Sequence, residues 1–547
     1  MGNYTALYSI LLLLLFGGTS FAQTGNHSQT SPLEGTWEVI PKLSPGVDRH
    51  SRRLSMEIEV NGDRVNLRKN WGRRGERSED LDLVADGKAR IFPVEGRFNL
   101  TTVYSALHVR AGDERTIAAS LDEDGRKLVL DIEYPVDVAQ GRAMLKETQV
   151  FRANTVEPML DYTITRKSRP AESEETYTLK AAGSMEAYVV YLDDNWEVAG
   201  DLQRQAALIA LQGLANRDGP NLYLVYPDTW QFNYSGRLMD WYEEERGYGF
   251  TELEGLAEAL EIFRDKLDGY VIWDKAVRNS LNVAFTIAGL ENAVPVTEEQ
   301  IGLVEALGLE PVADLRGLFT GMTDAELYSW ARDRYWDRCS RKHLIWMGGH
   351  SGRVMKPGVA DWGVAQRVFF QDLSCRASDT EEFQMASELL ADMDEDALIM
   401  GWHSYAKDRE SEHVSLCSSF GLPVLGLHSN PNVSFENQIG FSEGFVFANN
   451  HNVEPDEVVV PENKVYLAAI QTDSIGIGAW LKPGRGEIPY AWEVTMNYSW
   501  LVPSLLEFFY STATPNDHFV GALSGPGYMY PKSVPEEKLP GLIQRAN

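Results

Sequence analysis

The chain has 547 residues, with 80 acidic and 50 basic side chains and a formal net charge of -30 at pH 7. This excess of negative charge disfavours nucleic acid as a partner, because phosphate binding needs clustered Lys and Arg. Hydrophobic residues make up 44% of the chain, so it can bury substantial cores, and its length fits roughly two to four domains.

The amino terminus carries an apolar run, SILLLLLFGG, followed by Ser20-Phe21-Ala22. The run is too short to span a bilayer, and the small residues around Phe21 fit a signal-peptidase site. We therefore predict that residues 1–22 are a cleaved signal peptide and that the mature protein is secreted or periplasmic. No later stretch is expected to insert stably into a membrane.

Residues 34–155 show the alternating pattern of an all-β domain. Two hairpins are indicated, one turning at Asn61-Gly62-Asp63 and the other at Asp124-Gly125. Short strands at this spacing favour a small barrel or sandwich. The opening LEGTWEV resembles the Gly-x-Trp start of lipocalin-like barrels, which leaves open that this domain binds a hydrophobic ligand.

Residues 185–455 are typical of parallel α/β domains. Apolar strands are predicted at 187–192, 221–226, 269–274, 343–348, 397–402 and 423–428, and residues 201–217 have helical spacing. A last unit, 460–547, starts with the predicted strand KVYLAAIQTDS, continues with the helical WLVPSLLEFFYST and ends with the strand HFVGALSG. Residues 156–184 are interpreted as a connecting strand and linker.

Polar side chains follow several of these strands. Asp473 follows VYLAAIQT, Trp402 and His403 end ALIMGWH, and Ser524 ends HFVGALS. Ligands of parallel α/β folds bind beyond the carboxyl ends of the strands, and acids beside aromatic rings suit a carbohydrate. Each residue also has a structural interpretation: Asp473 as a helix cap, Trp402 as core, and Glu412 as part of a solvated charge run.

Metals and cofactors find no support in the sequence. His403 and His413 do not have a zinc spacing, and three cysteines (Cys339, Cys375 and Cys417) cannot form a cysteine zinc site and allow at most one disulfide. GGHSG at 348–352 lacks the Lys-Ser/Thr of a P-loop, and no Gly-x-Ser-x-Gly elbow occurs. We expect no cofactor and no metal.

Residues 525–531, GPGYMYP, match the signature of the GxGYxYP glycoside hydrolase family letter for letter. Segments such as DWGVAQRVFFQDLS, GWHSYAKDRESEHVSLCSSFGLPV and SNPNVSFEN also resemble the family, in the same order, so the resemblance covers about residues 185–547. It implies α/β subdomains followed by a partial β/α-barrel-like C-terminal domain, in secreted bacterial proteins that act on poly- or oligosaccharides.

The resemblance and the strand ends together suggest a set of site residues. The residues predicted for catalysis are Asp473, Glu412 and Glu493; those predicted to contact sugar are Trp402, His403, Trp492, Asn516, Asp517, Ser524, Gly525, Gly527, Tyr528 and Tyr530.

Two departures from the family pattern limit this prediction. Ser474-Ile475-Gly476 replace the Gly-Asp-Asn that usually follows the first acid, so a second acid is missing there. The domain after the signature is also short, which suggests a truncated barrel. A non-catalytic glycan-binding protein is therefore the alternative to a glycoside hydrolase.

Overall fold

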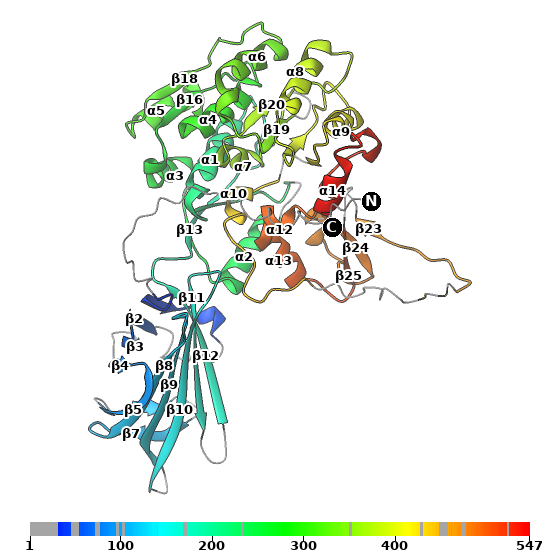
Figure 1. Ribbon diagram of the computed structural model, residues 1–547. Helices are drawn as coiled ribbons and strands as arrows, with labels where there is room; N and C mark the ends of the chain where they lie inside the picture. Colours follow the sequence, from blue (N-terminus) through cyan, green and yellow to red (C-terminus); the bar gives the residue numbers. More distant parts are fainter. Residues whose placement is uncertain are drawn as a thin grey trace, which may run out of the picture.

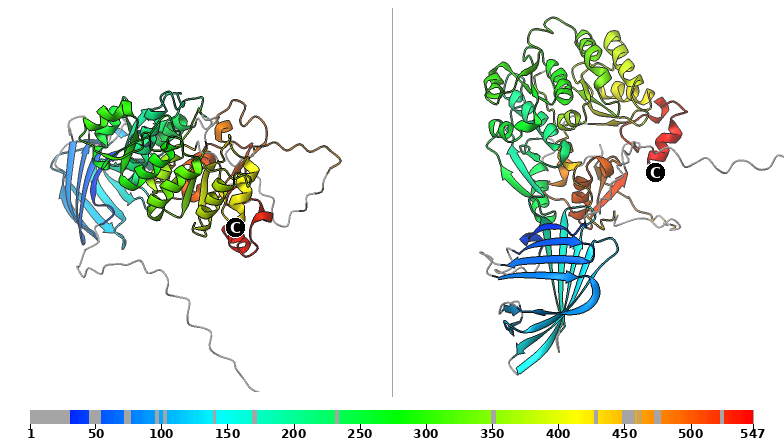
Figure 2. Two further views of the ribbon diagram at one scale, coloured as in Figure 1. Left: turned by 90° about the horizontal axis from the view of Figure 1, so that it is seen from above. Right: turned by 60° about the vertical axis from the view of Figure 1, so that its left-hand side comes forward.

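The computed structural model describes residues 31–44, 54–71, 77–94, 98–100, 104–138, 141–167, 172–230, 234–348, 353–426, 430–447, 458, 460, 462–471, 477–521 and 525–546. The predicted signal peptide lies outside these residues. Figure 1 shows an antiparallel β domain (blue to cyan) at one end and α/β units (green to yellow) at the other, with the C-terminal unit (orange to red) beside α2. The second view of Figure 2 separates the β domain from the rest in the same way.

The β domain is one twelve-stranded antiparallel sheet that curls into a barrel-like shape, with β4 in contact with β8. Its main strand order is β4-β3-β2-β1-β12-β11-β10-β9-β7-β6, and β8 joins β9 and β5. The strands are β1 (Gly35–Val39), β2 (Ser55–Asn61), β3 (Arg64–Trp71), β4 (Arg77–Val84), β5 (Asp86–Pro93), β6 (Phe98–Leu100), β7 (Tyr104–Val109), β8 (Glu114–Leu121), β9 (Lys127–Val138), β10 (Gly141–Ala153), β11 (Met159–Lys167) and β12 (Glu172–Ala181).

Both predicted hairpins are confirmed. β2 pairs with β3 across Gly62, and β8 pairs with β9 across Gly125; both glycines have a positive φ that an L side chain rarely adopts. The stretch interpreted as connecting strand and linker instead supplies β11 and β12, which pair along their whole length. Buried and exposed side chains alternate along β11, which is the pattern of a strand with one face in the core.

The interior of the β domain contains ion pairs as well as apolar side chains. Lys69 is 0% exposed and pairs with Glu79 at 2.7 Å, while Arg166 pairs with Glu147 at 2.6 Å. Lys69 shares its face of β3 with the buried Leu67. Buried charges need partners of opposite charge, and these four groups supply one another. The interior of the sheet therefore combines a large apolar core with buried ion pairs.

The α/β part contains three parallel sheets, which confirms the parallel character predicted for it. Their strand orders are β14-β13-β15, β17-β16-β18 and β20-β19-β21-β22. The strands are β13 (Glu186–Tyr191), β14 (Leu222–Val225), β15 (Gly249–Glu252), β16 (Gly269–Ile272), β17 (Ala293–Val296), β18 (Pro311–Asp314), β19 (His343–Met347), β20 (Phe369–Gln371), β21 (Leu398–Trp402) and β22 (Val424–Leu425). The helices are α1 (Leu202–Ala215), α2 (Ser235–Glu245), α3 (Leu256–Ile262), α4 (Ser280–Glu291), α5 (Ile301–Glu305), α6 (Asp324–Tyr335), α7 (Ala360–Ala365), α8 (Thr380–Ala391), α9 (Glu410–Ser419) and α10 (Val433–Glu436).

Helices from the three sheets pack against one another at glycines. A Cβ atom on Gly213 of α1 would lie 2.2 Å from the carbonyl oxygen of Asp361 in α7. A Cβ atom on Gly289 of α4 would lie 3.0 Å from the carbonyl oxygen of Val364, which also belongs to α7. The bare backbones therefore let α1 and α4 approach α7 closely, which fixes the three sheets relative to one another.

The C-terminal unit adds a fourth parallel sheet, β23-β24-β25, and shares one continuous hydrophobic core with the α/β part. Its elements are β23 (Ile470–Gln471), α11 (Ile477–Trp480), β24 (Tyr490–Val494), α12 (Tyr498–Leu501), α13 (Pro503–Ser511), β25 (Asp517–Gly521) and α14 (Leu539–Ala546). The β domain has its own core and meets the rest at Arg246, which pairs with Glu157 on one side and with Glu507 of α13 on the other.

Membrane spans and metal-binding clusters are absent from the described residues. None of their helices combines the length and apolarity that a membrane span requires. They contain no group of three or more His, Cys, Asp or Glu side chains placed to hold a metal ion. Cys339, Cys375 and Cys417 are all buried and free.

Candidate functional site

A cluster of charged side chains lies at the carboxyl ends of three parallel strands. Arg278 and Asn279 follow β16, Asp372 directly follows β20, and Lys407 lies in the loop after β21. Asp324, the first residue of α6, completes the group. Ligands of open parallel sheets bind at this edge, so the cluster is at the position where the fold favours a site.

Asp372 is the most deeply buried member, with 0% of its surface exposed. Burial raises the pKa of its carboxyl group to about 6, although Arg278 and Lys407 oppose the shift. Its Oδ2 accepts a hydrogen bond from Arg278, while its Oδ1 has no partner among the described residues. Asp372 can therefore hold or release a proton near neutral pH.

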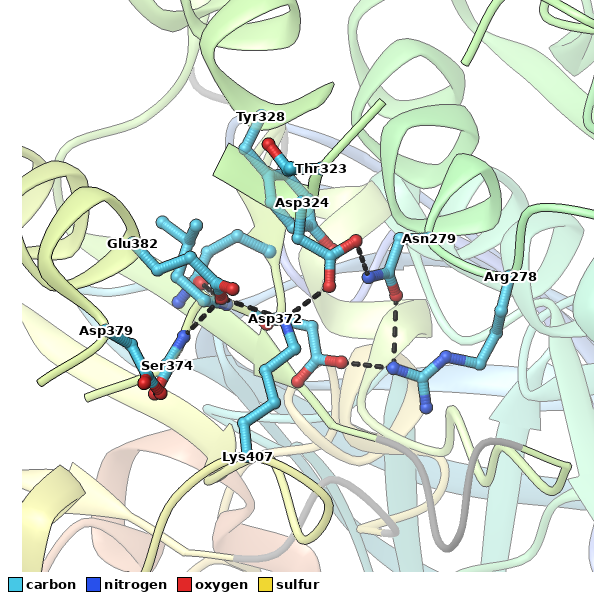
Figure 3. Close-up of polar contacts among 12 residues, drawn as sticks. Arg278, Asn279, Thr323, Asp324, Tyr328, Asp372, Ser374, Asp379, Glu382 and Lys407 are labelled. Atoms are coloured by element: carbon cyan, nitrogen blue, oxygen red, sulfur yellow. Dashed lines mark hydrogen bonds and ion pairs between the residues drawn. The ribbon is translucent and has the colours of Figure 1, made fainter. Parts of the chain in front are cut away.

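Lys407 connects the carboxylates of the cluster. Its ammonium group lies 2.5 Å from Oδ2 of Asp324 and 2.8 Å from Oε2 of Glu382, and it donates to the backbone oxygen of Asp372 at 2.6 Å. Burial lowers the pKa of Lys407, but the carboxylates outweigh burial, so the pKa is raised. Figure 3 shows Asp324, Asp372 and Glu382 gathered around this lysine. Lys407 thus remains charged and acts as an electrostatic anchor.

Further contacts fix the orientation of the two outer acids. Asn279 donates to Oδ1 of Asp324 at 2.7 Å, so both oxygens of Asp324 are held (Figure 3). The backbone N–H of Ser374 donates to Glu382 at 2.8 Å, and the Ser374 hydroxyl donates to Asp379 at 2.6 Å. The acids therefore keep defined positions without a ligand.

A histidine–aspartate pair lies on the neighbouring loop. His403 Nδ1 is 3.0 Å from Oδ1 of Asp408, whose Oδ2 accepts the backbone N–H of Cys375 at 2.6 Å. Both His403 and Asp408 are buried. Asp408 thereby ties the loop after β21 to the loop after β20. Deeper in the fold, His413 has a pKa lowered to about 3 by burial and is neutral at physiological pH.

The signature residues 525–530 attach to the same sheet through its edge strand β22. Tyr528 and Val424 exchange backbone hydrogen bonds of 2.8 and 3.1 Å. The Tyr528 ring lies 4.9 Å from the Trp402 ring, and Gly426 is required because its Cβ would fall 2.6 Å from the tyrosine ring. Tyr530 is 39% exposed. The structure therefore brings Trp402, His403 and Tyr528 together at one end of the sheet.

The glycines of the signature have a backbone role. Gly527 has a φ of 146°, and a Cβ there would lie 2.7 Å from the carbonyl oxygen of Val424. Gly525 also has a positive φ, of 88°. Asn497 donates to the carbonyl oxygen of Pro526 at 2.5 Å, which fastens the loop from its other side.

Other predicted site residues lie elsewhere or outside the described residues. Asp473 and Ser524 lie outside the described residues. Glu412 caps α9, with Oε2 accepting the backbone N–H of Arg409 at 2.8 Å. Glu493 is half-buried in β24, and its Oε2 has no partner among the described residues.

The amino end of β25 contains Asp517 and is preceded by Asn516, and Trp492 lies beside it on β24. The signature instead follows the carboxyl end of β25. Trp492 donates to Oδ1 of Asp517 at 2.8 Å, and the other carboxylate oxygen accepts from Arg485 at 2.6 Å. Asn516 donates to a backbone oxygen at 2.7 Å. These side chains are engaged within the C-terminal unit, and the charged cluster does not include them.

The sequence reasoning missed Arg278, Asp324, Asp372 and Lys407. Asp372 had a usable signal, since it directly follows β20, whose first two residues belong to the short apolar run VFF. Lys407 and Asp324 had none, because only the fold brings α6 and the loop after β21 together.

Comparisons with known proteins agree with this architecture. Four family models match successive parts of the chain: "GxGYxYP_N 1st domain" at 187–265, "GxGYxYP_N second domain" at 267–339, "GxGYxYP third domain" at 341–438, and "GxGYxYP putative glycoside hydrolase C-terminal domain" at 463–547. A search of curated protein sequences finds no match.

Two of the matching solved structures differ in what they show. The crystal structure of a "putative hydrolase" from Bacteroides thetaiotaomicron VPI-5482 has 18% identity and a TM-score of 0.54, covering 66% of this chain and 67% of that one, and shows a similar fold. Zebrafish ileal bile acid-binding protein complexed with cholic acid has 14% identity over 28% of this chain and 100% of its own, with a TM-score of only 0.18, too low to compare folds. On the four matching models, the chain belongs to the GxGYxYP family of putative glycoside hydrolases.

Proposed function

We propose that the protein is a secreted enzyme that hydrolyses glycosidic bonds at the carboxyl edge of the third α/β sheet. The observation that carries this proposal is Asp372, a wholly buried carboxyl group with a pKa of about 6 at the end of β20. Glycoside hydrolysis needs a carboxylic acid that is still protonated near neutral pH and a second carboxylate nearby. Family membership points to the same reaction class.

The roles follow from the contacts. Asp372 acts as the general acid, because its raised pKa keeps a proton available for the leaving oxygen. Asp324, held by Lys407 and Asn279, is the second carboxylate and acts as base or nucleophile. Asp473, which follows β23 in the sequence, stays in the proposal as a third acid. Trp402 and Tyr528 form the aromatic side of the site.

A glycan-binding protein without catalysis is the second candidate. It is favoured by the ion pairs of Asp372 with Arg278 and by the replacement of Gly-Asp-Asn by Ser474-Ile475-Gly476. In such a protein the charged cluster would position hydroxyl groups without a proton transfer.

The test is release of reducing ends from a panel of polysaccharides by the wild-type protein and by Asp372→Asn, Asp324→Asn and Asp473→Asn. We expect the first two variants to lose at least about a hundredfold in turnover, the usual contribution of one acid or base. Asp337→Asn serves as the control, since that side chain is fully exposed and outside the cluster.

Unchanged turnover in Asp372→Asn would remove this residue from the mechanism. Binding of a glycan by the wild-type protein without any product would favour the second candidate. Neither binding nor product on the whole panel would overturn both.

A further inference from the structure

A second polar feature lies away from the charged cluster, at the carboxyl end of β13. It is a cavity of about 530 Å³ lined by Asp194, Asn195, Trp196, Glu197, Ala199, Gly200, Val354 and Lys356. We call it the β13–β19 cavity, because its two walls are the loops that follow these strands. Its volume lies within the range of small-molecule sites, roughly 300–1,000 Å³.

The walls of the cavity are tied together by backbone hydrogen bonds. The N–H of Val198 donates to the oxygen of Arg353 at 2.8 Å, and the N–H of Met355 donates to the oxygen of Trp196 at 3.0 Å. A Cβ on Gly200 would lie 2.4 Å from Oδ1 of Asn195, so a larger residue at this position would displace the Asn195 amide. The cavity is thus built from fixed backbone.

Aromatic rings support the cavity from within the fold. The Trp196 ring lies 4.3 Å from the Trp230 ring and stacks over Tyr226 at 6.1 Å. Lys356 holds its ammonium group 5.0 Å from the centre of the Trp230 ring. Cation–π attraction of this kind restrains the lysine side chain at the wall.

The two carboxylates of the cavity are not engaged by the described part of the fold, and Lys356 is restrained there by the Trp230 ring. The side chains of Asp194, Glu197 and Lys356 make no hydrogen bond or ion pair with any residue that the structure describes, in contrast to those of Asp324 and Lys407. Two carboxylates and one ammonium group offer acceptors and a donor to hydroxyl groups. With this lining, and a net charge of -30 on the chain, an anionic ligand would be repelled.

The segment after β19 connects the cavity to the loop after β21, which carries Lys407. The wall residues Arg353 to Lys356 belong to the segment after β19, and β19 lies between β20 and β21 in the sheet. A Cβ on Gly348, just after β19, would lie 2.5 Å from the carbonyl oxygen of His403. Five residue steps separate Gly348 from Arg353, a span of at most roughly 18 Å. An extended chain of sugars that follows this segment would pass from the cavity to the loop that carries Lys407.

We propose that the β13–β19 cavity binds neutral sugar rings of the glycan whose bond is cleaved at the charged cluster. Asp194 and Glu197 accept hydrogen bonds from sugar hydroxyls, and Lys356 donates one. The cavity therefore selects an uncharged oligosaccharide and holds it away from the reacting bond. This inference rests on the proposed function for its choice of glycan.

The test separates binding from hydrolysis by working in the Asp372→Asn background. Isothermal titration with cello-, xylo-, manno-, malto- and chito-oligosaccharides identifies a neutral ligand of this variant. Adding Glu197→Gln or Lys356→Ala is expected to weaken its Kd about tenfold, the loss of one hydrogen bond to a charged group. Glu298→Gln, an exposed acid elsewhere, is the matched control and leaves the Kd unchanged.

The outcomes are distinct for the two proposals. An unchanged Kd in Glu197→Gln and Lys356→Ala would overturn the cavity proposal, as would binding of oligouronates in place of every neutral sugar, or no binding at all. Weakened binding in these variants, with no product from the wild-type protein on the same ligand, would support the cavity and overturn hydrolysis alone.

Discussion

Replacing Asp372 with Asn is expected to stabilise the protein at neutral and alkaline pH while removing its activity. The carboxyl group has an ordinary pKa of 3.8 when exposed and a pKa of about 6 in the fold, because burial disfavours its charge. The folded protein therefore binds this proton more tightly than the unfolded chain, and stability falls as the pH rises from about 4 to 6. A shift of about two pKa units corresponds to roughly 3 kcal/mol. Asn carries no charge, so it avoids this cost.

The assay is urea unfolding of both proteins at pH 4 and at pH 8. We expect a small difference in the free energy of unfolding at pH 4, and an advantage for the variant that approaches roughly 3 kcal/mol at pH 8. Asp517→Asn is the control, because its free energy of unfolding should change in the opposite direction. Burial disfavours the charge of Asp517, but hydrogen bonds from Thr514 and Trp492 outweigh it, so its pKa is lowered and the variant should lose stability at pH 8.

The reasoning would be refuted if Asp372→Asn were less stable than the wild type at pH 8. The ion pair with Arg278 would then contribute more than burial costs, and the carboxyl group would have no proton to give at neutral pH.

Three further substitutions test the frame around the site. Gly213→Ala should cost at least about 2 kcal/mol in urea unfolding, because its Cβ would overlap the backbone of α7, whereas Gly302→Ala faces open space and should be neutral or slightly stabilising. Tyr528→Ala should lose roughly 2 kcal/mol of packing against Trp402 and make the signature segment more sensitive to limited proteolysis; equal cleavage of both proteins would contradict this. Asp408→Asn should lower the melting temperature by the equivalent of about 1–3 kcal/mol, because an amide cannot accept both of the hydrogen bonds held now; an unchanged melting temperature would count against it.

The parallel strands were predictable because their residues form short, almost continuous apolar runs. The six predicted runs correspond to β13, β14, β16, β19, β21 and β22. Strands β15 and β18 were missed because their residues are partly or fully exposed and do not form an apolar run. Strands β17 and β20 were also missed.

The predicted strand KVYLAAIQTDS shows that an apolar run can also predict a longer strand than the fold forms. Only Ile470 and Gln471 pair with β24, and Val465 and Leu467 are 96% and 97% exposed. An apolar pattern reports that a segment suits a sheet, but it does not supply the partner strand that makes one.

The site was predictable only where its residues follow a recognised strand. Strand-end reasoning found Trp402 and His403 and placed the signature near a ligand face. The predicted sugar contacts also included Asp517, which stands at the start of β25 and not at its end. Arg278 and Lys407 could not be found, because their proximity depends on how the second and third sheets pack.

The pairing of Val424 with Tyr528 has a consequence for synthesis on the ribosome. Domains fold in order as the chain emerges, so the third sheet can form while β22 is still its open edge. Tyr528, which pairs with this edge, is synthesised 104 positions after Val424. It emerges together with Tyr530, whose N–H donates to Ser418 in α9. During that interval the nascent protein exposes an unpaired strand, and the family signature ends the exposure. The tyrosine-rich segment thus also covers the edge strand β22, which is synthesised well before it.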